Sequence, residues 1–104
     1  MNILLASESF VVRESLENLL KELTHDPQIL STSDLTKIDL EELIDLDFIF
    51  TDIKENCNNH ISIIKEAKNY FKNLRVMILD SKNDKNIFEK AVQIGVEGYI
   101  IGFT

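Results

Sequence analysis

The chain has 104 residues, the size of one domain, and 44% of them are hydrophobic, enough for one core. Its net charge of -7 argues against binding to nucleic acids or anionic membranes, because both require a cationic surface. No apolar run approaches the roughly 20 residues that span a bilayer, and the single cysteine, Cys57, cannot form an internal disulfide. We therefore expect a cytoplasmic protein that contacts neither membranes nor nucleic acids directly.

The first half of the chain alternates apolar runs with amphipathic segments. Residues 2–6 form a continuous apolar run, which predicts a strand buried on both faces. Ser9 is expected to cap a helix of about four turns that ends before Pro27. Residues 28–32 predict a weaker strand, and residues 39–45 predict a short helix.

The second half repeats this alternation. Residues 47–51 predict a buried strand, and apolar residues at helical spacing over residues 61–71 predict a helix. A further strand is expected at residues 75–79, a helix at residues 87–94 and a last strand at residues 98–101. Gly95 is expected to end the last helix in the left-handed conformation. Strands that alternate with helices predict an α/β domain with a parallel sheet and helices on both faces.

Polar residues follow the predicted strands. In a parallel sheet, function gathers at the carboxyl ends of the strands. The residues at that edge are Ser7 and Glu8, Asp52, Asp80 and Ser81, and Gly102. Clustered carboxylates can hold a divalent cation such as Mg²⁺ through oxygen ligands, and one of them can take up a phosphoryl group as an acyl phosphate.

Three segments resemble the receiver domain of bacterial two-component response regulators. Residues 1–16 (MNILLASESFVVRESL) are similar to the family opening, which reads roughly ILIADDHPLVREGL. Asp52-Ile53-Lys54 resembles the DIR that carries the phosphorylated aspartate, and residues 91–101 (AVQIGVEGYII) resemble ALRAGADGYLL. The resemblance covers the whole chain. It is nearest to the NarL/FixJ-like response regulators, which have a C-terminal helix-turn-helix output domain. It implies a doubly wound, flavodoxin-like five-stranded sheet of order 2-1-3-4-5.

The resemblance also implies roles for single residues. Asp52 matches the phosphoacceptor, and Glu8 matches the second of the two metal-binding acids. Lys54 would offer its backbone carbonyl to the metal, and Tyr99 matches the aromatic switch residue. These positions imply a Mg²⁺ site.

Other positions depart from the family pattern. Ser7 stands where the first acid should be, Asp80 where a Thr or Ser senses the phosphoryl group, and Gly102 where a nearly invariant lysine lies. That lysine normally neutralises the phosphoryl oxygens, which is the main catalytic device in phosphoryl transfer. We expect a pocket with up to three carboxylates, which repels phosphate and holds Mg²⁺ weakly at most. Ser81 or Lys82 could take over part of the missing role.

We interpret the chain as an atypical receiver domain in signal transduction and transcription regulation, not an enzyme. It would act through protein contacts or dimerisation, with a histidine kinase or a second copy as partner. One alternative is a conventional receiver that a histidine kinase phosphorylates on Asp52. Another is a stand-alone protein-interaction scaffold, and a small acyl-phosphate hydrolase is a more distant one.

The family's fifth helix has no counterpart in the sequence. Its absence is expected to leave an apolar strip exposed near Ile101 and Phe103. Residues 1–104 are accordingly expected to be the N-terminal part of a longer regulator, whose further domain binds DNA, or to dimerise through this side. Outside these features, His25 and His60 are expected to be solvated, and Cys57 lacks partners for a metal site.

Overall fold

Five parallel strands form one sheet in the computed structural model, which describes residues 1–53, 57–80 and 84–101. The strands are β1 (Asn2–Ala6), β2 (Gln28–Thr32), β3 (Phe48–Asp52), β4 (Arg75–Asp80) and β5 (Gly98–Ile101). Their order is β2-β1-β3-β4-β5, which confirms the flavodoxin-like order implied by the resemblance. β1 lies between β2 and β3, and its register pairs Ala6 with Thr32 on one side and with Thr51 on the other.

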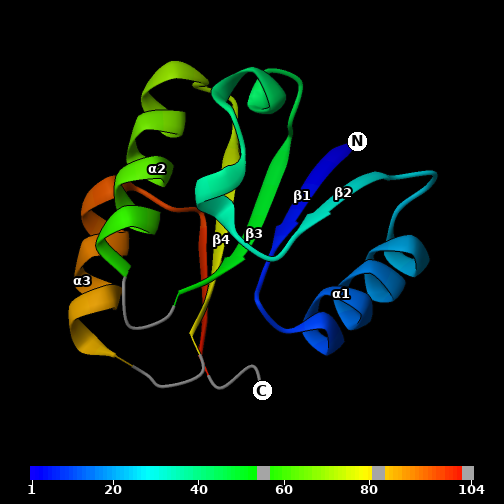
Figure 1. Cartoon of the computed structure of the whole chain (residues 1–104), viewed down its shortest axis with the longest axis horizontal. Helices are drawn as coiled ribbons and strands as arrows, with labels where there is room; N and C mark the ends of the chain where they lie inside the picture. Colours follow the sequence, from blue (N-terminus) through cyan, green and yellow to red (C-terminus); the bar gives the residue numbers. More distant parts are fainter. Residues whose placement is uncertain (54–56, 81–83, 102–104) are drawn as a thin grey trace.

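Three α-helices cover the sheet. They are α1 (Phe10–Leu23), α2 (Cys57–Tyr70) and α3 (Lys85–Ile94). α1 lies on one face of the sheet, and α2 and α3 lie on the other (Figure 1). Ser9 caps α1 as predicted, with its Oγ accepting from the Val12 amide at 3.2 Å. Gly95 ends α3 with a φ of 77°, a conformation that glycine adopts without strain.

The crossover from β2 to β3 contains no α-helix, so the helix predicted at residues 39–45 is wrong in type. Two 3₁₀ helices take its place, η1 (Leu35–Lys37) and η2 (Leu40–Leu43). Leu35 and Leu43 are both buried, and each carbonyl accepts from the amide three residues later, at 3.2 Å. Short segments gain little from isolated α-helix formation, so burial of these two leucines decides the backbone path.

The core has two parts because the sheet is buried on both faces. The larger cluster lies under α2 and α3 and includes Ile49, Val76 and Ile78 of the sheet. The smaller cluster lies under α1 and includes Ile3 and Leu5 of β1. Ile101, the last residue of β5, is 52% exposed. Phe103, expected in the same strip, lies outside the described residues.

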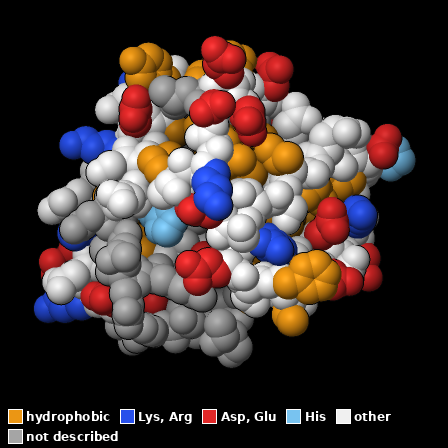
Figure 2. Space-filling view, in the orientation of Figure 1, with side chains coloured by type: hydrophobic (Ala, Val, Ile, Leu, Met, Phe, Trp, Pro, Cys, Tyr) orange, Lys and Arg blue, Asp and Glu red, His pale blue; other side chains and the backbone are white. Residues whose placement is uncertain are grey.

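The surface agrees with the acidic composition. On the face seen in Figure 1, acidic side chains are spread widely and basic side chains lie singly between them (Figure 2). None of the helices that the structure describes has the length and hydropathy needed to cross a membrane.

Candidate functional site

The carboxyl edge of the sheet brings Ser7 and Asp52 into direct contact. Because Ala6 of β1 pairs with Thr51 of β3, the next residues of both strands are neighbours. The Ser7 hydroxyl donates a hydrogen bond of 2.6 Å to Oδ2 of Asp52. Ser7 is buried and Asp52 is half-buried, so this bond is partly shielded from water.

Local contacts fix the Ser7 hydroxyl in its role as a donor. Its Oγ accepts from the Ser9 amide at 3.1 Å, which leaves its hydrogen directed at Asp52. The Ser7 carbonyl accepts from the Arg13 guanidinium at 2.9 Å. A neutral donor therefore contacts Asp52 from the position where the receiver pattern has an acid.

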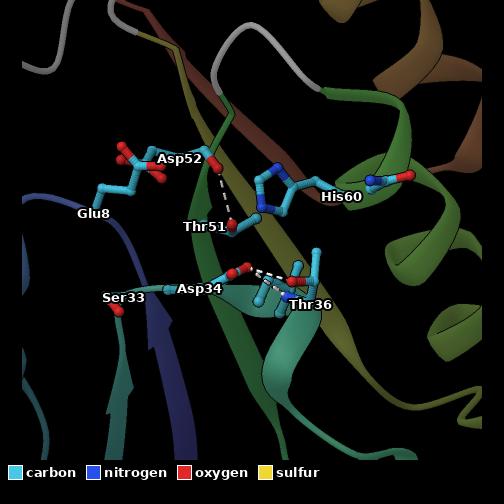
Figure 3. A pocket seen from close by; sticks show the side chains of 10 residues that line it. Glu8, Ser33, Asp34, Thr36, Thr51, Asp52 and His60 are labelled. Carbon is cyan, nitrogen blue, oxygen red and sulfur yellow. Dashed lines mark hydrogen bonds between the residues drawn. The ribbon is translucent and has the colours of Figure 1, made fainter.

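Glu8 and Asp52 border one cavity of about 220 Å³ at this edge (Figure 3). The cavity is lined by Ala6, Glu8, Ser33, Asp34, Leu35, Thr36, Thr51, Asp52, Asn59 and His60. In Figure 3, Glu8 and Asp52 lie on one side of it and His60 on the other. No lysine or arginine is among the described residues that line it.

Asp34 adds a carboxylate that the sequence reading missed. Its Oδ1 accepts from both the Thr36 hydroxyl at 2.6 Å and the Thr36 amide at 2.9 Å. These bonds, with the nearby charges of Lys37 and His60, hold the pKa of Asp34 below its ordinary value. The sequence feature that could have identified Asp34 is the Asp-x-Thr spacing at residues 34–36, which is typical of a capped turn.

His60 differs from its expected solvated state. Its imidazole borders the cavity next to Thr51 (Figure 3), and its Nδ1 is buried without a hydrogen-bond partner among the described residues. Within the described part of the chain, no three His, Cys, Asp or Glu side chains are grouped so that they could hold a metal ion. Lys54, which would supply a carbonyl to a Mg²⁺ site, lies outside that part.

Asp80 is not among the described residues that line this cavity. Side chains alternate along a strand, so Asp80 shares the face of Val76 and Ile78, opposite to the face of Leu79, whose register partner is Asp52. Its Oδ2 accepts from the Tyr99 hydroxyl and, at 2.8 Å, from the Asp84 amide. Glu8, Asp34 and Asp52 thus border the cavity, and Asp80, at the same edge of the sheet, bonds to Tyr99 and Asp84.

Tyr99 is fixed by the same carboxylate. Burial raises the pKa of the Tyr99 phenol, and the hydrogen bond to Asp80 and the charges of Asp80 and Asp84 raise it further. The Tyr99 ring meets the Phe88 ring edge-on, with centroids 5.2 Å apart. Ser81, Lys82 and Gly102, which the receiver pattern also places at this edge, lie outside the described residues.

Solved structures share this fold, although no family model matches the chain and no curated protein matches its sequence. A response regulator receiver domain protein from Clostridium thermocellum aligns with a TM-score of 0.80 and 22% identity, covering 99% of this chain and 82% of that one. A DNA-binding response regulator of the LuxR family from Staphylococcus aureus aligns with a TM-score of 0.74 and 21% identity, covering 96% and 84%.

A response regulator protein from Burkholderia pseudomallei, solved with a phosphorylated aspartic acid, calcium and citrate, has a TM-score of 0.79 and 16% identity; the alignment covers 99% of this chain and 60% of that one. At these identities the likeness is one of fold. It confirms the resemblance to receiver domains at that level.

Proposed function

We propose that this chain is a receiver-type signalling domain that acts through protein contacts, with Asp52 a poor phosphoryl acceptor. The receiver fold supports the signalling role. The hydrogen bond from Ser7 to Asp52 is the main support for Asp52 being a poor phosphoryl acceptor. Its partner would be a histidine kinase or a second copy of the chain. Regulation of transcription would require DNA binding by a further domain or a partner; the similar Staphylococcus aureus protein is described as a DNA-binding response regulator.

The argument rests on electrostatics at the Asp52 carboxylate. An aspartate that attacks a phosphodonor needs positive charge nearby, supplied by a divalent cation and basic side chains, to stabilise the transferring group. Here Ser7 offers a neutral hydroxyl in place of a metal-binding acid. The cavity beside Asp52 adds the carboxylates of Glu8 and Asp34 and no basic side chain among the described residues. An incoming phosphate would therefore meet repulsion.

Intact-mass spectrometry after incubation with a small phosphodonor and Mg²⁺ tests this proposal. We expect no phosphoryl adduct on the folded wild-type chain, and Asp52→Asn serves as the matched control. An adduct that is present in the wild type and lost in Asp52→Asn would overturn the proposal and favour a conventional receiver.

Sedimentation velocity tests the partner. Concentration-dependent dimers would support self-association as the mode of action. A monomer at all concentrations would exclude a second copy and leave a different protein as the partner.

A further inference from the structure

The buried carboxylate of Asp80 joins three elements of the fold. Asp80 is 1% exposed at the end of β4, where a charged group needs hydrogen-bond partners to be tolerated. One partner is the Tyr99 hydroxyl of β5, and another is the amide of Asp84, the residue before α3. The carboxylate thus holds β5 and the start of α3 against the end of β4.

The start of α3 is fixed through Asp84. Its side-chain Oδ1 accepts from the Asn86 amide at 2.8 Å and the Ile87 amide at 3.4 Å, so it is the N-cap of the helix. The same residue donates its own amide to Asp80. The helix therefore begins at a point set by the buried carboxylate.

Tyr99 makes the second connection to α3. Its hydroxyl donates to Asp80, and its ring meets Phe88 edge-on at 5.2 Å. Phe88 lies one turn from Val92, and both are well exposed on α3, at 45% and 61%. The position of Tyr99 therefore influences where this exposed apolar pair lies.

We propose that Asp80 and Tyr99 form a latch. Their hydrogen bond holds the Tyr99 side chain toward Asp80 and keeps α3 packed against β5, and it needs no phosphoryl group or other ligand to do so. The exposed pair of Phe88 and Val92 is then presented in one fixed arrangement, whatever the state of Asp52. This inference rests on the contacts of Asp80 and does not require the proposed signalling function.

Amide hydrogen exchange in Tyr99→Phe tests the latch. The substitution removes the hydroxyl and keeps the ring, and Tyr70→Phe is the matched control because Tyr70 is exposed on α2. A hydrogen bond to a charged group contributes enough that its loss should speed exchange by about 10- to 100-fold. We expect this effect at the α3 amides, with those of α1 unchanged. Equal rates in α3 of both variants, or equal acceleration in α1 and α3, would overturn the latch.

Titration of the Tyr99 phenol gives a second test, which does not depend on amide hydrogen exchange. Tyr70 and Tyr99 are the two tyrosines of the chain, and it has no tryptophan. In Tyr70→Phe the tyrosinate absorbance therefore reports Tyr99 alone. Adding Asp80→Asn removes the charge that disfavours ionisation, so Tyr99 should ionise at a lower pH than in Tyr70→Phe. Ionisation at the same pH in both variants would refute direct coupling.

Discussion

Replacing Ser7 by Ala measures how strongly the Ser7 hydroxyl stabilises the carboxyl edge. The change removes the 2.6 Å bond to Asp52 and the acceptor for the Ser9 amide. Hydrogen bonds to charged groups contribute about 1.5–3 kcal/mol, but Asp52 is half-buried and water can replace part of the loss. We therefore expect Ser7→Ala to lower the free energy of unfolding by about 1–2 kcal/mol.

Urea denaturation followed by circular dichroism provides the assay. With an m-value of about 1–3 kcal/mol/M, the midpoint should fall by about 1 M. Ser62→Ala is the matched control because Ser62 is exposed on α2, where alanine is neutral or slightly favourable. If Ser7→Ala is as stable as Ser62→Ala, the bond to Asp52 contributes nothing, and the main support for a poor phosphoryl acceptor is lost.

Three further changes have defined outcomes. Ser7→Asp places a second carboxylate beside Asp52, so the variant should be less stable without Mg²⁺ and be stabilised by adding it; a melting temperature insensitive to Mg²⁺ would contradict this. Gly98→Ala would put its Cβ 2.2 Å from Cε of Met77, the flexible end of that side chain, so Met77 should change rotamer at a cost of about 0.5–1 kcal/mol in urea unfolding; a loss above about 3 kcal/mol would contradict this. Burial raises the pKa of Glu97, but hydrogen bonds from Lys68 and a backbone amide outweigh this and lower it. The stability lost in Glu97→Gln should be about 0.5–1 kcal/mol at neutral pH, and the gap should close as pH falls below 4.5.

Four of the five strands were predictable because each contains a short apolar run, whereas β2 (Gln28–Thr32) is mostly exposed and gave the weaker prediction. Ile3, Leu5, Ile49 and Val76 are buried as such runs require. The strand order came from the resemblance, because apolar runs carry no information on which strands pair. The crossover at residues 33–47 was mispredicted since its helical spacing spans too few residues to outweigh the burial of Leu35 and Leu43.

The sequence predicted which edge of the sheet carries the site, but not which face of the sheet each side chain takes. The carboxyl-end rule placed Ser7 beside Asp52, and the structure has them in contact. The same rule says nothing about which face of the sheet a side chain takes. Period-two alternation from Val76 puts Asp80 on the opposite face from Leu79, the register partner of Asp52. The inward position of His60 depends on how α2 packs, which no local pattern encodes.

The position of β1 between β2 and β3 delays completion of the sheet during synthesis. The register pairs Ile3 with Phe48, so β1 gains its β3 neighbour only after about 45 further residues have been translated. At about 5–20 residues per second, the roughly 45 intervening residues take about 2–9 seconds. During that time the apolar residues of β1, which end up fully buried, have no complete sheet to join. The nascent β1 segment is therefore where chaperone protection and aggregation would compete.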